Sequence, residues 1–132
     1  MKLALAQMLV APGDRAGNLQ RAHERIAAAA QQRADIVLLP ECLDLGWTHP
    51  SARKEATPVP EGDTCQQLAA AAREFQVHVC AGFVERAGER LFNAAVLLSP
   101  AGEVVLHHRK IHELDFAREL YSTGDRLGVA DT

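Results

Sequence analysis

The sequence has few cysteines and lacks any long apolar run. Its three cysteines, Cys42, Cys65 and Cys80, are widely spaced and include no C-x-x-C pair. This argues against a disulfide framework and a zinc knuckle, and it predicts free thiols in a reducing compartment. No stretch approaches the roughly 20 apolar residues needed to span a bilayer, and the N-terminus turns polar too early for a signal-peptide core. We therefore expect no membrane partner and a cytoplasmic location.

An excess of positive charge is also lacking. Fourteen Lys and Arg residues stand against 17 Asp and Glu residues, giving a formal net charge of −3, and no basic stretch is long enough to neutralise a row of phosphates. We therefore expect no nucleic-acid partner. The 132 residues, 48% of them hydrophobic, suffice for one folded domain but not for two full ones.

What the sequence does contain is an alternation of strand and helix patterns. Apolar runs bounded by turn residues predict strands over 2–10, 34–39, 77–84, 91–98 and 103–108, with a further strand beginning at 127–130. Apolar positions at helical spacing predict a helix over 17–33 with Asn18 as N-cap, and a second helix capped by Asp63 or Thr64. Residues 112–121 are expected to form one or two helical turns.

These patterns predict an α/β fold. The first strand, helix and second strand form a βαβ unit with parallel strands. Residues 42–62 contain Pro and Gly without a sustained period and predict a long loop above the strand ends. Residues 85–90 are polar with one glycine and predict a hairpin, so the last three strands form an antiparallel meander. The expected architecture is a mixed sheet with helices on one face.

Two charged residues are expected at strand ends, where ligands bind in open α/β sheets. Glu41 follows the apolar run 36–40, where partial desolvation would raise its pKa toward the range useful for general acid/base catalysis. A solvated glutamate is the alternative. Lys110 closes the run 103–110, where its ammonium could approach Glu41 or stabilise an oxyanion. Taken alone, a lysine beside an arginine is more often a solvated charge.

The histidines do not predict a metal site. His107, His108 and His112 have no carboxylate or thiol at a recognised ligand spacing. We expect these imidazoles to be hydrogen-bonded or exposed.

The cysteines are expected to have structural roles. Cys65 lies in an expected helix and Cys80 in an expected strand, and both are predicted to pack in apolar surroundings. Cys42 directly follows Glu41 at the strand end where ligands are expected to bind. Adjacent residues leaving a strand usually point in different directions, which favours a structural role for Cys42 over that of a nucleophile.

The ordered set of motifs resembles the nitrilase or carbon–nitrogen hydrolase superfamily over the whole chain. In the first half the resemblance lies in A-L-A-Q at 4–7, Gly13-Asp14, Asn18-Leu19, A-D-I-V-L-L-P-E at 34–41 and Gly46. In the second half it lies in F-N-A-A at 92–95, H-R-K-I-H at 108–112, Tyr121 and Gly124-Asp125. The pairing of L-P-E with a later R-K-x-H in this strand order is the most specific signal.

The resemblance implies a four-layer αββα sandwich, of which this chain would supply about the first half. It also implies a Glu-Lys-Cys triad that hydrolyses non-peptide C–N bonds through a thioester acyl-enzyme. Glu41 matches the general base, and Lys110 matches the lysine that stabilises the tetrahedral intermediate. The family's cysteine belongs to an Ile-Cys-x-Asp motif that is absent from these residues. Residues 1–132 are therefore expected to be a carbon–nitrogen hydrolase domain truncated at its C-terminal end and inactive alone.

The resemblance further implies a small-molecule amide, carbamoyl or nitrile substrate, no cofactor, and a homo-oligomer, dimeric or larger, in the complete protein. An additional active-site glutamate of the family matches either Glu113 or Glu119. Two alternatives stay open: a binding or interaction module made from half of the fold without catalysis, and Cys42 acting as a substitute nucleophile.

Overall fold

Five strands and two long helices build the chain. The structure is a computed structural model that describes residues 1–132. Its elements are β1 (Leu3–Leu5), α1 (Arg15–Gln31), β2 (Ile36–Leu38), α2 (Ala52–Glu55), α3 (Asp63–Phe75), β3 (His78–Ala87), β4 (Arg90–Leu98), β5 (Val104–Arg109) and the 3-10 helix η1 (Asp115–Glu119).

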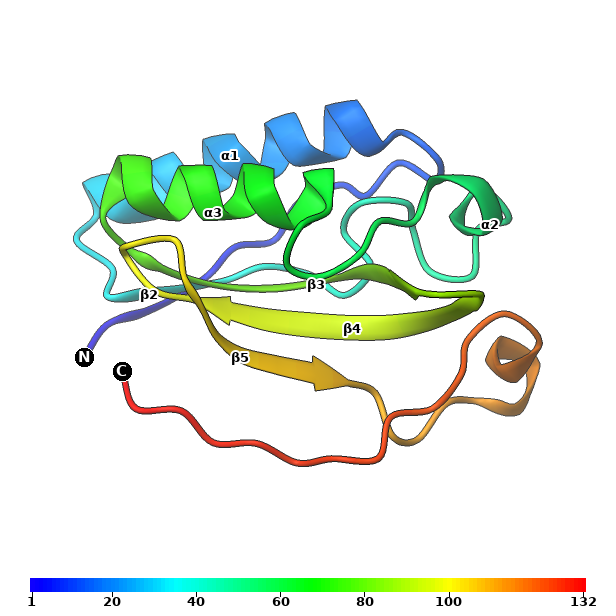
Figure 1. Cartoon of the computed structure of the whole chain (residues 1–132). Helices are drawn as coiled ribbons and strands as arrows, with labels where there is room; N and C mark the ends of the chain where they lie inside the picture. The colour runs from blue at the N-terminus through cyan, green and yellow to red at the C-terminus, as the bar shows by residue number, and fades with distance from the viewer.

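The strands form one mixed sheet in the order β1-β2-β3-β4-β5. β1, β2 and β3 are parallel, while β4 runs antiparallel to β3 and β5 antiparallel to β4. This confirms the predicted mixed sheet, in which a βαβ unit leads into a meander. The helices α1 and α3 cover one face, and the segments that follow β2 and β5 gather at the same end of the sheet, at the right of Figure 1.

The hydrophobic core fills the space between the helices and one face of the sheet. Ile26 of α1, Leu68 of α3 and Phe83 of β3 are buried there, and burying a side chain of this size contributes roughly 1.5–3 kcal/mol. Because side chains alternate along a strand, the intervening residues point to the opposite face. Neither long helix covers that face (Figure 1), and Leu5 and Leu38 are 69% and 39% exposed on it.

The N-terminal cap of α1 differs from the prediction. Asp14, not Asn18, is the N-cap, and its carboxylate accepts a hydrogen bond from the Gly17 N–H (3.0 Å). Asn18 is buried within the helix, where its side-chain amide donates to the carbonyls of Ala11 (2.8 Å) and Asp44 (2.7 Å). The asparagine therefore holds two loops together, and this contact replaces the predicted cap.

Two other boundaries differ for local reasons. Asp63 is the first residue of α3 rather than its cap, because Gly62 occupies the N-cap position. The first strand is shorter than predicted and ends at Leu5, which pairs with Leu38 at the end of β2. The Ala6 N–H still donates to the Leu38 carbonyl (2.9 Å). Beyond Leu38 the chain turns away at Pro40, so residues 7–10 have no strand to pair with.

The residues after η1 do not form the predicted strand. The Gly124 N–H donates to the Lys110 carbonyl (2.8 Å), so this segment starts beside β5 and then runs back along it, as Figure 1 shows. Leu127 and Val129 are 87% and 96% exposed. Without buried side chains or a backbone ladder, nothing fixes a strand here.

The hairpin between β3 and β4 is tighter than predicted. β3 continues through Ala87 and β4 begins at Arg90, so Glu85 lies in a strand rather than in a polar turn. Its side chain is 2% exposed. The carboxylate accepts hydrogen bonds from Arg109 Nε (2.8 Å) and His107 Nε2 (2.9 Å), which is how a charged residue is tolerated in the sheet.

None of the helices has the length and apolar character that crossing a membrane requires.

Candidate active site

Glu41 lies where the chain leaves β2 and crosses over β3. The Gly82 N–H donates to the Pro40 carbonyl (3.2 Å), and the Gly82 carbonyl accepts from the Leu43 N–H (2.8 Å). A Cβ at residue 82 would lie 2.9 Å from the Glu41 Cα, so glycine is required for this close approach. The crossing fixes the Glu41 backbone at the carboxyl end of β2.

Lys110 reaches the same place from the end of β5. Its backbone N–H donates to the Asn93 carbonyl (2.8 Å), and its Nζ lies 2.9 Å from Glu41 Oε1. The side-chain amide of Asn93 donates to the same carboxylate oxygen. The structure therefore brings the two residues predicted for the site together, and Asn93 contacts both of them.

The two charges set each other's protonation state. Burial alone would raise the pKa of Glu41, but the hydrogen bonds from Lys110 and Asn93 and the lysine charge outweigh it and hold the pKa below its usual range. The expectation of a raised pKa is therefore wrong, because the Glu41 side chain is 52% exposed and its desolvation is weaker than its pairing. The hydrogen bond to Glu41 raises the pKa of Lys110, so both groups are ionised near pH 7.

Glu113 is a second carboxylate at Lys110. Its Oε2 lies 3.7 Å from Lys110 Nζ, and its side chain is fully buried. Neither carboxyl oxygen has a hydrogen-bond partner in the chain. Burial raises the pKa of Glu113, opposed by the charge of Lys110. Glu119 is exposed and lines a different hollow together with Arg53, so of the two glutamates considered only Glu113 lies at the Glu41–Lys110 pair.

A hollow of about 250 Å³ adjoins the pair on the face of the sheet that the helices leave open. Glu41, Asn93 and Lys110 form its polar end, and strand residues such as Leu38 and Ala95 line much of the remainder. A small molecule there would meet charged and hydrogen-bonding groups at one end and apolar contacts along the strands, which is the usual composition of a ligand site.

None of the three cysteines provides an activated thiol at this pair. Cys42 is fully buried, and its Sγ lies 3.9 Å from the Tyr121 hydroxyl. Burial raises the pKa of the Cys42 thiol to about 12. It also raises the pKa of Cys65 to about 11 and raises that of Cys80. Raised pKa values leave little thiolate near pH 7, which favours the structural roles expected for Cys42 and Cys65. Cys80 differs from the expectation of a buried packing residue, because it is half-buried and lines the hollow.

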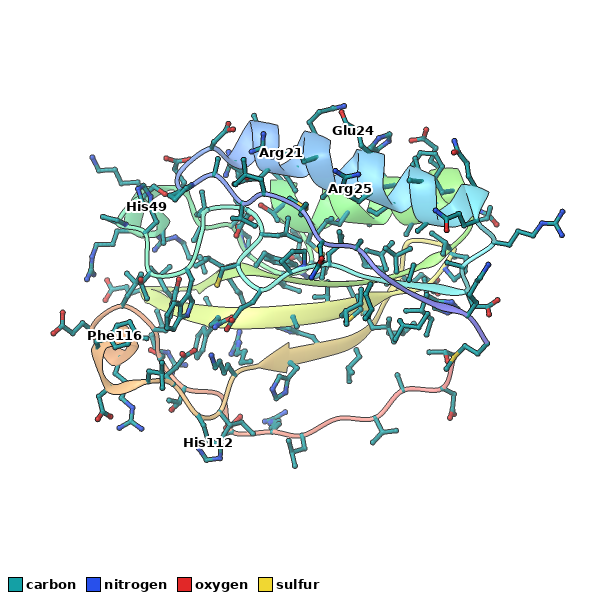
Figure 2. The ribbon with its side chains drawn as sticks, turned by 180° about the vertical axis from the view of Figure 1, so that it is seen from behind. Arg21, Glu24, Arg25, His49, His112 and Phe116 are labelled. Carbon is teal, nitrogen blue, oxygen red and sulfur yellow. The ribbon has the colours of Figure 1, made fainter.

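The three histidines lie in different surroundings. His107 bonds to Glu85, His108 lines the hollow, and His112 is exposed and projects away from the sheet (Figure 2). No group of three or more His, Cys, Asp or Glu side chains is placed to hold a metal ion.

The sequence did not reveal three further residues at this end of the sheet, of which Asn93 and Trp47 adjoin the pair and Phe116 packs against Trp47. Asn93 belongs to the F-N-A-A motif, but its contact with Glu41 joins residues 52 positions apart. The Trp47 ring centroid lies 5.7 Å from Lys110 Nζ, and the Phe116 ring meets the Trp47 ring at 5.2 Å. For the two aromatic residues, the sequence offered only one signal: Trp47 lies in the segment after Glu41, and Phe116 lies in the segment after Lys110.

Replacing Asn93 with Ala is expected to raise the pKa of Glu41, because one of the two hydrogen bonds to the charged carboxylate is lost. Lys110→Met should raise it further, since it removes a hydrogen bond and a positive charge together. Carboxyl-carbon NMR titration of the 132-residue chain measures both shifts. An unchanged or lowered pKa in the Asn93→Ala protein would contradict the positioning role of Asn93.

Comparison with known proteins agrees with the motifs. The family model described as carbon-nitrogen hydrolase matches residues 2–132. The chain is 33% identical over 141 residues to omega-amidase NIT2-A of Xenopus laevis, covering 99% of this chain and 50% of that protein. It is 34% identical over 127 residues to an (R)-stereoselective amidase of Pseudomonas sp., covering 96% and 46%. The chain thus spans about half the length of the curated relatives it matches.

A solved structure shows the same fold. Nit3 of Saccharomyces cerevisiae, described as a member of branch 10 of the nitrilase superfamily, superposes with a TM-score of 0.89 at 28% identity. The match covers 100% of this chain and 51% of that one. The sheet and its two helices therefore have the nitrilase fold, as the motifs predicted.

Proposed function

Because this chain belongs to the carbon-nitrogen hydrolase family, we propose that it supplies two members of a Glu-Lys-Cys triad, Glu41 and Lys110. The reaction is hydrolysis of a non-peptide C–N bond in a small amide, carbamoyl compound or nitrile. Residues 1–132 form the first part of the hydrolase domain, and the nucleophilic cysteine comes from polypeptide outside these residues. The observation that carries the proposal is the Glu41–Lys110 ion pair at 2.9 Å on the rim of a hollow.

Each group has the charge that its role requires. Glu41 is ionised near pH 7, so it can take the proton of an incoming thiol as the sulfur attacks the carbonyl carbon. Lys110 keeps its proton and can stabilise the negative charge that develops on the carbonyl oxygen. Glu41 then gives its proton to the leaving amine, takes one from the water that attacks the thioester, and returns that proton to the departing sulfur, which restores the thiol and the ionised Glu41.

Glu113 is proposed as the additional active-site glutamate. Its buried carboxyl group lies 3.7 Å from Lys110 Nζ and has no hydrogen-bond partner within the chain. A second carboxylate beside Lys110 keeps the ammonium aimed at the site while Glu41 changes its protonation state. Without Glu113, Lys110 would be oriented by Glu41 alone.

The test compares two polypeptides: the 132-residue chain and the product of the same gene read past Thr132. We expect the longer product to release ammonia from propionamide and to lose this activity on thiol alkylation, while the 132-residue chain releases none. In the longer product, Glu41→Gln and Lys110→Met are each expected to lower kcat at least about a hundredfold. Glu113→Gln is expected to lower kcat about tenfold, and Glu119→Gln, the matched exposed control, to leave it unchanged.

Three results would overturn the proposal. The first is full activity in Glu41→Gln. The second is hydrolysis by the 132-residue chain with an acyl adduct on Cys42, which would make that cysteine the nucleophile. The third is a longer product that binds amides without cleaving them, which would indicate a binding module.

A further inference from the structure

Two aromatic side chains near Lys110 have no role in the proposed reaction: Trp47, which faces its ammonium, and Phe116, which packs against Trp47. Trp47 comes from the loop after β2, and Phe116 comes from η1, at the end of the molecule shown in Figure 2. The two rings meet edge to face with centroids 5.2 Å apart, and the Trp47 centroid lies 5.7 Å from Lys110 Nζ. We call Trp47 and Phe116 the aromatic wall; Trp47 faces Lys110, and Phe116 extends the apolar surface beyond it.

The aromatic wall is open to solvent. Trp47 is 38% exposed and Phe116 is 58% exposed, and Leu114, two residues before Phe116, is 55% exposed. Single exposed apolar residues are common on protein surfaces, whereas Trp47 and Phe116 pack against each other and present one continuous apolar surface next to Lys110.

The backbone holds Trp47 in place. Its neighbours Gly46 and Thr48 both have left-handed conformations, with φ of 82° and 58°. The Thr48 N–H donates to the hydroxyl of Tyr121 (3.1 Å), a residue that is 2% exposed. A non-glycine residue such as Thr48 keeps a left-handed conformation only where its surroundings hold it there, and such positions cluster at ligand sites. The backbone on both sides of Trp47 therefore holds its ring next to Lys110.

We propose that the aromatic wall selects the group attached to the reacting carbon, and that the preferred substrates are amides bearing an aryl or bulky alkyl group. This inference rests on the proposed hydrolase function. Aromatic faces and edges attract such groups through stacking and dispersion. An acyl group with its own carboxylate would lose hydration against the rings and would approach the charged Glu41.

The single tryptophan of the sequence makes the test direct, because all tryptophan fluorescence comes from Trp47. The 132-residue chain is titrated with phenylacetamide, propionamide and succinamate, with excitation at a wavelength that only tryptophan absorbs. Phenylacetamide is expected to reach half-saturation at a concentration at least fivefold lower than the other two. Phe116→Ala should reduce this preference to less than twofold. Leu3→Ala, which removes an exposed leucine from the start of β1, away from the strand ends that carry the pair, should preserve it.

Any of four results would overturn the role of the aromatic wall. The three amides could reach half-saturation at equal concentrations, or succinamate could bind most tightly. Phe116→Ala could leave the preference unchanged, or none of the three amides could change the fluorescence. None of these results bears on the proposed hydrolysis, which is tested separately by the kcat of Glu41→Gln in the longer product.

Discussion

Replacing Arg109 with Leu is expected to lower the free energy of unfolding at pH 7 by about 3–5 kcal/mol, measured by urea denaturation. The reason lies at Glu85. Its carboxylate is buried in β3 and accepts hydrogen bonds from both Nε and Nη2 of Arg109. Without the guanidinium, a buried negative charge keeps only His107 as a partner. The guanidinium also stacks on the Phe92 ring, 4.1 Å from its centroid, so a smaller packing loss adds to the effect.

The loss should depend on pH in a defined direction. Burial would raise the pKa of Glu85, but the hydrogen bonds from Arg109 and His107 outweigh it and lower the pKa from 4.5 to about 2. A lowered folded-state pKa stabilises the protein above pH 4.5, and this stabilisation is lost as the pH falls toward 2. In Arg109→Leu burial dominates and the pKa of Glu85 rises above 4.5. The stability difference between the two proteins should therefore shrink as the pH falls from 7 to 4.

The double variant Glu85→Leu/Arg109→Leu separates charge from packing. Replacing a buried ion pair with apolar residues is often neutral, whereas removing one partner is not. The double variant should regain at least half of the stability lost in Arg109→Leu. If it is no more stable than the single variant, the loss comes from packing on Phe92, and the uncompensated charge is not its cause.

The sheet was predictable because its signals are local. Apolar runs, prolines and turn glycines follow one another along the chain and mark the strands. Parallel strands necessarily have their carboxyl ends at the same end of the sheet. This is why Glu41 and Lys110 could be expected to approach each other, and they lie 2.9 Å apart. Asn18 shows the limit of such signals: it resembles a cap residue, but its partners Ala11 and Asp44 lie in loops that the helix pattern does not describe.

The polar contacts of the site were not predictable, because each depends on a partner far away in the sequence. Glu85 looks like a turn residue in the run 85–90 until the register places Arg109 beside it. The lowered pKa of Glu41 depends in the same way on Asn93 and Lys110. A sequence pattern indicates that a residue is charged and near a strand end, but only the packed structure decides whether burial or pairing controls its pKa.

Gly82→Val is the second substitution with a large expected effect, and it acts on the fold and the site together. The added Cβ would meet the Glu41 Cα at 2.9 Å and the Pro40 carbonyl oxygen at 3.2 Å. Both atoms belong to the backbone and cannot rotate away, so the crossing over β3 must shift. We expect a loss of about 3 kcal/mol in the free energy of unfolding, at the upper end of the usual cost of overpacking. A smaller loss is expected for Gly82→Ala.

The shift should also separate Glu41 from Lys110 and Asn93, because those partners are fixed on β5 and β4 while Glu41 moves with the crossing. In Gly82→Val the pKa of Glu41 should therefore rise toward its usual value, as carboxyl NMR measures. Gly88→Asn is the matched control: Gly88 has a φ of 61° and no atom within 4 Å of an added Cβ, and asparagine tolerates that conformation. It should change neither stability nor the pKa of Glu41. A low pKa of Glu41 retained in Gly82→Val would mean that the ion pair positions the crossing, and that Gly82 only accommodates it.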